Sequence, residues 1–159
     1  MAATNDSEQK ERIAKLYKAL RKKDNEHVAE VCRELPEDRQ LSDFKNNDGN
    51  TMLHEVATSD AMKDVAEELL TRDSDLLIAS NDSGETPIFC AARYGQTEMF
   101  EFLAEKMGLT EEGPEDYKPY LRRKDGTTVL HISIATECFG ELYILLLVHL
   151  QVLLVHFYF

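Results

Sequence analysis

Hydrophobic residues recur along the chain in pairs of short stretches at helical spacing, and polar connectors separate the pairs. Within residues 85–103, a stripe of small side chains is followed, after a glycine, by a bulkier stripe. Thr86 suits the N-cap of a first helix, Pro87 suits its first position, and Gly95 is expected to end it. The pattern predicts two short helices with a sharp corner between them. Such a pair buries too little apolar surface to fold alone, so we expect it to recur.

The turn before this helix pair does recur in register. A threonine stands two residues after a glycine at three places, Thr51, Thr86 and Thr128. The intervals are 35 and 42 residues, and an acidic stretch at 108–122 lengthens the second. Residues 8–40 carry a helix-pair pattern without the threonine and glycine, and we interpret them as a degenerate first unit. A turn and two helices repeated every ~33 residues indicate an array of stacked units.

The motif residues resemble the ankyrin repeat pattern Gly-x-Thr-Pro-Leu-His-x-Ala-Ala. Segment 84–92 (GETPIFCAA) matches best, with Phe89 in the place of the histidine. The first and third copies keep the histidine, as His54 and His131, and lose the proline. The resemblance implies an all-α solenoid of about three to four helix-turn-helix units joined by polar, hairpin-like tips. It also implies that these histidines bond to nearby backbone and lock turn to helix.

These assignments divide the chain into successive parts. We expect a disordered start at 1–7, the degenerate repeat at 8–40 and clear repeats at 41–150, interrupted by the acidic insert at 108–122. A charge-free tail at 142–159 overlaps the last predicted helix. A connected core is expected only where neighbouring units stack.

A narrower resemblance lies in the residue sequence of two segments, 86–95 (TPIFCAARYG) and 125–131 (DGTTVLH), with the acidic insert between them. Both are similar to plant ankyrin proteins that end in a multi-span PGG membrane domain. That resemblance implies a role in defence, cell-death or stress signalling. The sequence after Gly140 departs from this group.

The tail at 142–159 contains no Asp, Glu, Lys or Arg. As a helix it would span about 27 Å, slightly less than the ~30 Å hydrocarbon core of a bilayer. No basic cluster flanks it. One interpretation is membrane attachment through Leu142–Phe159. The others are the second helix of the last repeat, followed by its extension, and an artefact of truncation. The sequence leaves them open.

Charge and cysteine content limit the function classes. The net charge of −12 argues against a nucleic-acid partner. The three cysteines, Cys32, Cys90 and Cys138, are widely spaced and odd in number, which fits a reducing compartment. Residues 1–10 contain no signal-peptide pattern. We therefore expect a cytoplasmic protein, located at the cytosolic face of a membrane such as the plasma membrane if the tail attaches there.

No catalytic motif is complete. His54-Glu55 begins like a zinc-protease helix, but Thr58 stands where the second histidine is required. Cys90 would need a neighbouring histidine and a third, orienting group to act as a nucleophile. No phosphate-binding loop or calcium-binding spacing occurs. The sequence thus predicts a non-enzymatic protein with no metal, no cofactor and no small-molecule substrate.

An ankyrin array offers a concave surface made of tips and first helices, and such surfaces bind other proteins. We select Arg93, Tyr94, Arg123 and Lys124 as the leading contacts, because Arg and Tyr are typical interface anchors and 123–124 is a basic tip in an acidic protein. Ordinary turn chemistry is the alternative explanation for the other candidates. These are Asn47, Asp48, Asn81, Asp82 and Glu85.

Overall fold

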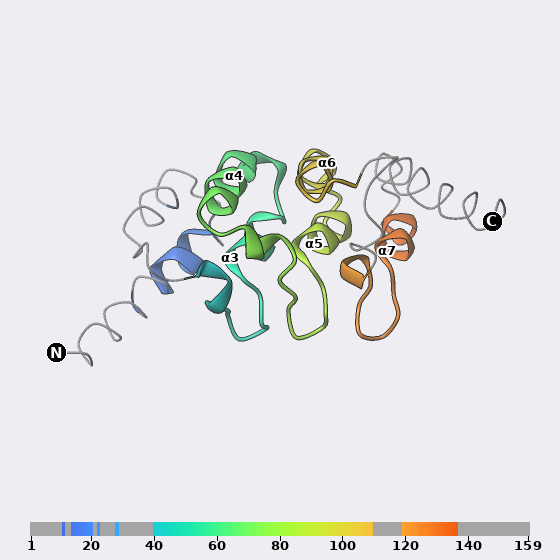
Figure 1. The fold of residues 1–159 in the computed structure, drawn as a ribbon, viewed down its shortest axis with the longest axis horizontal. Coiled ribbons are helices and arrows are strands. Elements are labelled where there is room, and N and C mark those ends of the chain that lie inside the picture. Colours follow the sequence, from blue (N-terminus) through green and yellow to red (C-terminus); the bar gives the residue numbers. More distant parts are fainter. Residues whose placement is uncertain are drawn as a thin grey trace.

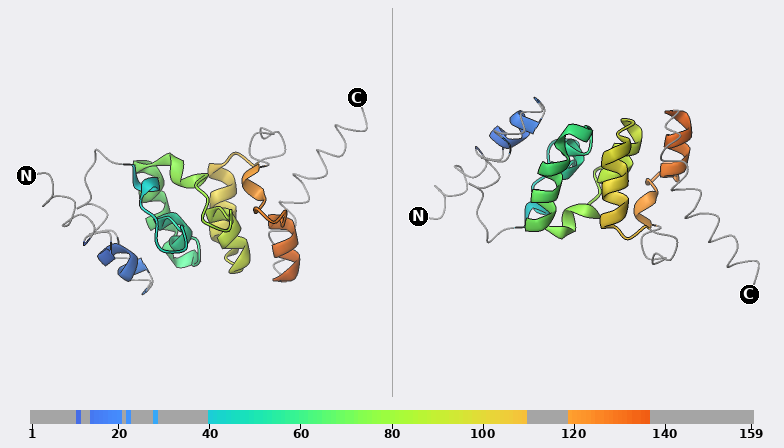
Figure 2. Two further views of the ribbon diagram at one scale, coloured as in Figure 1. Left: turned by 90° about the horizontal axis from the view of Figure 1, so that it is seen from below. Right: turned by 90° about the horizontal axis from the view of Figure 1, so that it is seen from above.

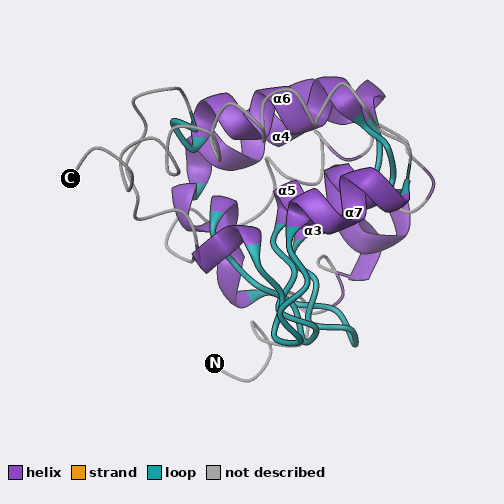
Figure 3. Cartoon of the chain, turned by 90° about the vertical axis from the view of Figure 1, so that its right-hand side faces the viewer, coloured by secondary structure: helices purple, strands orange, loops and turns teal. Residues whose placement is uncertain are grey.

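The computed structural model shows two layers of helices with a row of tips projecting from one side (Figure 1, Figure 3). It describes residues 11, 14–20, 22, 28, 40–109 and 119–136. Within these residues the regular structure is helical, apart from one isolated bridge between Arg122 and Thr128. The prediction of an all-α repeat fold is confirmed for this part. The predicted start at 1–7, most of 8–40, the middle of the acidic insert and the tail at 142–159 lie outside the described residues.

Each complete unit consists of a short helix, a corner and a longer helix. Helix α3 (Met52–Val56) pairs with α4 (Lys63–Arg72), α5 (Pro87–Arg93) pairs with α6 (Thr97–Lys106), and α7 (Val129–Ala135) begins the next unit. The 3-10 turns η1 (Leu41–Asp43), η2 (Asp60–Met62) and η3 (Ser74–Leu77) also belong to this order. The units follow one another along the long axis (Figure 2). The short helices share one layer, and α4 and α6 share the other.

Helix α5 is the most enclosed element of the described core. It contacts α3 on one side, α7 on the other and α6 behind it. Residues 87–92 are therefore all buried, and not only the small-residue stripe. Phe89 has no exposed surface, and Cys90 has 5%. The bulkier residues of α6, such as Phe100, are buried against this helix layer. Most of the stability of such short helices comes from this tertiary packing.

The corner between α5 and α6 is held by the preceding unit. Gly95 ends α5 in the left-handed region, with φ of 65°. The carboxylate of Asp60 then accepts a hydrogen bond from the Met99 N–H in the first turn of α6, at 2.8 Å. The Asp60 N–H donates in return to the Gln96 side-chain oxygen at 2.8 Å. Asp60 thus caps a helix of the next unit.

Three five-residue tips connect the units: tip 1 (46–50), tip 2 (81–85) and tip 3 (123–127). In each tip the first N–H donates to the fifth carbonyl, at 2.9, 2.9 and 2.8 Å respectively. Neighbouring tips are also bonded to each other. The Asp82 N–H donates to the Asp48 carbonyl at 3.2 Å, and the Lys124 N–H donates to the Ser83 carbonyl at 3.4 Å. The tips therefore form one stacked surface (Figure 3).

Glycine is required in tips 1 and 2 for two reasons. Gly49 and Gly84 have φ of 75° and 79°, a region that side chains disfavour. In addition, a Cβ on Gly49 would lie 2.7 Å from the Asp82 nitrogen, and one on Gly84 would lie 2.9 Å from the Lys124 nitrogen. Close stacking of the tips therefore excludes a side chain at both positions.

The threonines that precede the short helices do not all act alike. The Thr51 N–H donates to Nδ1 of His54 at 3.1 Å, and the Thr128 N–H donates to Nδ1 of His131 at 3.2 Å. These are two reciprocal capping boxes.

Thr86 is the N-cap residue that the sequence predicts, but it differs from the other two threonines. It occupies the N-cap position of α5, but its side chain makes no capping hydrogen bond. Phe89 stands where the histidine would be and cannot accept a hydrogen bond from the backbone. The Thr86 hydroxyl instead donates to the Tyr120 carbonyl at 2.8 Å, which links α5 to the chain that enters tip 3.

Candidate functional site

A groove of about 450 Å³ lies between tips 1 and 2, over the exposed sides of α3 and α5. Five tip residues line it: Asp48, Asn50, Asn81, Ser83 and Glu85. Six residues from the short helices and the positions just after them complete it: His54, Glu55, Thr58, Cys90, Arg93 and Tyr94. This is the concave position that the sequence predicts for the interaction surface. We call it the tip groove.

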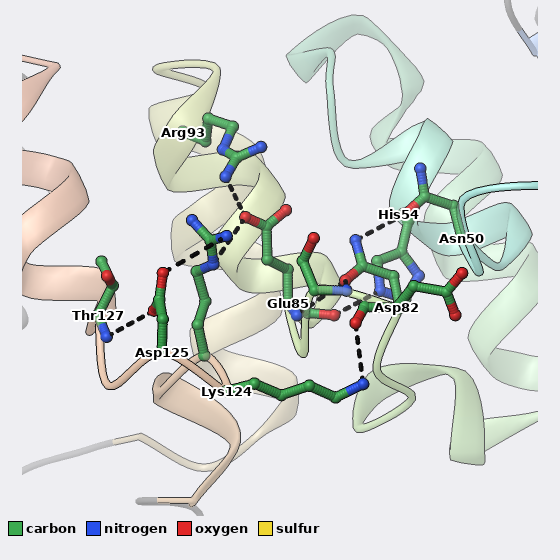
Figure 4. A network of polar contacts seen from close by, with 11 residues as sticks. Asn50, His54, Asp82, Glu85, Arg93, Lys124, Asp125 and Thr127 are labelled. Carbon is green, nitrogen blue, oxygen red and sulfur yellow. Dashed lines mark hydrogen bonds and ion pairs between the residues drawn. The ribbon is translucent and has the colours of Figure 1, made fainter.

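The Glu85 carboxylate is the charged centre of the tip groove. Only 4% of its side chain is exposed. Its Oε1 pairs with the Arg93 guanidinium on α5 (Figure 4). The same oxygen lies 3.4 Å from Nε of Arg123 in tip 3. Arg123 Nε is itself buried and makes no hydrogen bond, so this contact is an ion pair alone. A buried carboxylate needs such compensation, and both arginines are therefore engaged within the chain.

Tip 3 departs from the other tips in a way that makes this pairing available. In tip 1 the Asn46 side chain accepts hydrogen bonds from the N–H groups of Asp48 and Asn50, at 2.9 and 3.0 Å. Arg123 occupies the same position in tip 3, and a guanidinium accepts no hydrogen bond. Asp125 takes over by accepting from the Thr127 N–H at 2.9 Å, as Figure 4 shows. The Arg123 side chain is thereby free to reach the preceding unit.

Lys124 is also bound within the chain. Its ammonium group donates to the Asp82 carbonyl at 2.8 Å, across the gap between tips 2 and 3 (Figure 4). Arg123 has 23% of its side chain exposed, against 38% for Arg93. Both residues of the predicted basic tip therefore link tip 3 to tip 2.

His54 locks tip 2 to α3. Its Nδ1 accepts from the Thr51 N–H, which assigns the proton to Nε2, and Nε2 donates to the Glu85 carbonyl at 2.9 Å. The ring has 1% of its surface exposed. Burial lowers the pKa of His54 to about 4, although the hydrogen bond to Glu85 opposes this shift. The ring is therefore neutral at pH 7 and joins two units.

An amide network fixes the Glu55 carboxylate. Its Oε1 accepts from the side-chain amides of Asn46 and Asn50, at 2.8 and 3.2 Å. The Asn50 side-chain oxygen accepts in turn from the Asn81 amide at 2.8 Å. These bonds connect tip 1, tip 2 and α3 around the tip groove, so its polar groups are held in place before any partner binds.

Cys90 and His54 both line the tip groove but do not form a nucleophilic pair. Burial raises the pKa of the Cys90 thiol to about 12, and the charge of Glu85 acts in the same direction. The thiol is therefore protonated at pH 7 and is a poor nucleophile. Both ring nitrogens of His54 are bonded to backbone groups. The groove therefore does not offer the thiolate–imidazole pair that such chemistry needs.

Tyr94 lines the tip groove, and its aromatic side chain is largely exposed. It follows α5 directly and has 57% of its surface accessible. Among the described residues, Ile134 on α7 is the other large hydrophobic residue that is similarly exposed, at 55%. Ile134 does not line the groove. Tyr94 thus combines an accessible ring with a position beside fixed polar groups.

The structure separates the predicted contact residues into two groups. Those that line the tip groove are Asp48, Asn81, Glu85, Arg93 and Tyr94. Those that do not are Asn47, Asp82, Arg123 and Lys124. Sequence reasoning missed Asn50 and Thr58. Both could have been found from the repeat register. Asn50 holds the place in its repeat that Glu85 holds in the next, and Thr58 likewise corresponds to Arg93.

Asn47 lines a second hollow, of about 420 Å³, on the other side of tip 1. Lys18 and Lys22 contribute to it together with Tyr17. The Tyr17 hydroxyl donates a hydrogen bond to the Phe44 carbonyl, at 2.8 Å. N-terminal helical residues and residues of tip 1 thus line the same hollow.

In the described part of the chain, no group of three or more His, Cys, Asp or Glu side chains converges to hold a metal ion. No helix within the described ranges has the length and hydrophobicity needed to cross a membrane. The tail at 142–159, on which the membrane interpretation depends, lies outside those ranges.

Comparison with known families identifies the fold class. The family model described as ankyrin repeats, three copies, matches residues 16–113, more than half of the chain. The chain belongs to the ankyrin repeat family. No curated protein matches the sequence.

A solved structure agrees with this assignment. The chain is similar to the crystal structure of EF0377, an ankyrin repeat protein, with a TM-score of 0.61 and 20% sequence identity. The match covers 82% of this chain and 59% of the other, so this chain spans about three fifths of the length of EF0377. At this level of identity the similarity concerns the fold.

Proposed function

We propose that this chain is a non-enzymatic interaction module that binds another protein through the tip groove. The observation that carries the proposal is the position of Tyr94, a largely exposed aromatic ring on the rim of a concave, polar groove between two repeats. Exposed tyrosines beside ordered polar groups are common anchors of protein interfaces.

The rigidity of the groove supports the same conclusion. The tips are bonded to one another through backbone groups, and the side chains of Asn46, Asn50 and Asn81 fix the walls. A partner therefore meets a surface that loses little conformational freedom on binding, which favours affinity. The protonated Cys90 thiol and the fully bonded His54 ring argue for a binding role over a catalytic one.

The proposal is tested by affinity capture of partners with the full chain, followed by mass spectrometry. Tyr94→Ala should remove specific partners, because it deletes the exposed ring while leaving the core unchanged. Glu98→Ala is the matched control, since Glu98 is exposed on α6 and lies outside the groove. Equal capture by both variants, with unchanged melting temperatures, would exclude the tip groove as the interface.

Two finer expectations follow from sequence resemblance and composition. One is a role in plant-type defence or stress signalling, and the other is attachment to a cytosolic membrane face through 142–159. Carbonate extraction of membranes tests the second, since an inserted tail keeps the protein with the lipid. Release into solution would leave a cytoplasmic adaptor as the function.

A further inference from the structure

The tip groove carries negative charge that the described residues do not balance. Of its three carboxylates, Glu85 is compensated by Arg93 and Arg123. Among the described residues, no ion pair involves Asp48 or Glu55. Both line the groove, and Asp48 is exposed. Lys45 directly precedes tip 1, but its ammonium group donates to the Ser80 carbonyl at 2.8 Å, and Lys45 does not line the groove.

Glu55 is oriented as a fixed acceptor. Its Oε1 is held by the two amides of tip 1, at 2.8 and 3.2 Å, and these contacts leave Oε2 as the remaining acceptor of the carboxylate. The accessible ring of Tyr94 belongs to the same groove. A groove lined by carboxylates and an accessible aromatic ring suits a guanidinium or ammonium group, which can pair with carboxylate oxygens and lie over a ring.

We propose that the tip groove takes an arginine or lysine side chain from an extended segment of the partner protein. The Asp48 and Glu55 carboxylates contact the cation, and the Tyr94 ring packs against it. This inference rests on the proposed function and adds the chemistry of the partner. An acidic or phosphorylated segment fits less well, because the arginines nearest the groove already pair with Glu85. A purely apolar segment would cover the fixed polar groups without pairing them.

The test uses the full chain and four pools of immobilised nine-residue peptides. The central residue is Arg, Lys, Glu or phosphoserine, and the flanking positions are randomised. We expect the Arg and Lys pools to bind at least about fivefold more tightly than the Glu pool, with the difference shrinking in high salt. Glu55→Gln and Asp48→Asn should each weaken binding of the Arg pool about fivefold, because each removes one charge and keeps the side-chain size.

Glu101→Gln on α6 is the matched control and should leave binding unchanged, since Glu101 is exposed away from the groove. Preference for the Glu or phosphoserine pool would overturn the inference, as would full binding by a folded Glu55→Gln variant. If all pools bind equally and Tyr94→Ala abolishes binding, the partner chemistry is wrong while the proposed function stands. If Tyr94→Ala changes neither peptide binding nor protein capture, both fail.

Discussion

Arg123 Nε in tip 3 lies 3.4 Å from Glu85 Oε1 in tip 2, so a side chain from one repeat compensates a buried carboxylate of the preceding repeat. The contact crosses between units that also meet through backbone bonds, apolar packing and the side-chain hydrogen bonds of Thr86 and Lys124. It gives Arg123, which the sequence predicts as a partner contact, a role as a link within the solenoid.

Removing this link should destabilise the fold. We expect Arg123→Ala to lower the free energy of unfolding by about 1–3 kcal/mol, because the Glu85 charge would keep one cation in place of two. Denaturation with guanidinium chloride measures the change. Arg122→Ala is the control, since Arg122 is exposed beside it. Equal stability of the two variants would show that the ion pair contributes nothing. Arg123→Glu should lower the melting temperature as well, because it places a second carboxylate beside Glu85.

The tip glycines allow the stacking of tips to be measured. Gly84→Ala and Gly126→Ala both place a side chain at positive φ, of 79° and 86°. Only the first also places a Cβ 2.9 Å from the Lys124 nitrogen, whereas the Cβ on Gly126 meets no described atom within 4 Å. Gly126→Ala should cost about 1 kcal/mol from backbone strain, and Gly84→Ala clearly more. Equal losses in thermal unfolding would refute close packing between tips 2 and 3.

Stability should fall in mild acid because His54 must stay neutral. Its pKa is about 4 in the folded chain, against ~6.5 when unfolded. This contribution is complete above the unfolded pKa and is lost as the pH falls from ~6.5 toward 4, by up to about 1.4 kcal/mol per pH unit.

The control for this pH effect is His54→Phe, which copies the residue found at Phe89 in the next repeat. Urea denaturation gives the unfolding free energy of both proteins between pH 7 and pH 5. The carboxylates titrate alike in both, so their contribution cancels in the difference. The stability advantage of the wild type should shrink over this range. A difference that stays constant with pH would mean that burial does not lower the pKa of His54.

Asp60 provides a test of capping between repeats. Asp60→Ala should lower the stability by about 1 kcal/mol, because the Met99 N–H at the start of α6 loses its acceptor. Asp60→Asn keeps a side-chain oxygen and should recover most of the loss. Thermal unfolding followed by circular dichroism distinguishes the two. Loss of the same size for both variants would show that charge, rather than capping, is the contribution of Asp60.

The sequence predicted the helices better than the contacts between their side chains. The spacing of Thr51, Thr86 and Thr128 was sufficient for the repeat fold, because it marks turns that each unit needs. It was not sufficient to place Arg123, whose role depends on the neighbouring tip. Likewise Thr86 has the residue type of a cap, but Phe89 removes the reciprocal partner and the hydroxyl bonds to Tyr120.

The candidate site was predicted in part for the same reason. Residues that protrude from a turn or a helix end, such as Asp48 and Tyr94, could be chosen from their position in the repeat. Whether an arginine faces a partner or a buried carboxylate depends on packing across repeats. Arg93 illustrates this, since it lines the groove and pairs with Glu85 at once.

The central claim is that the tip groove contacts a protein partner at Tyr94, and photo-crosslinking tests it most directly. The photoreactive residue benzoylphenylalanine is placed at position 94 or, in a separate protein, at the exposed position 101 on α6. After irradiation in cells, we expect a defined crosslinked partner from position 94 and none from position 101. A partner crosslinked only from position 101, or equally from both, would contradict the account.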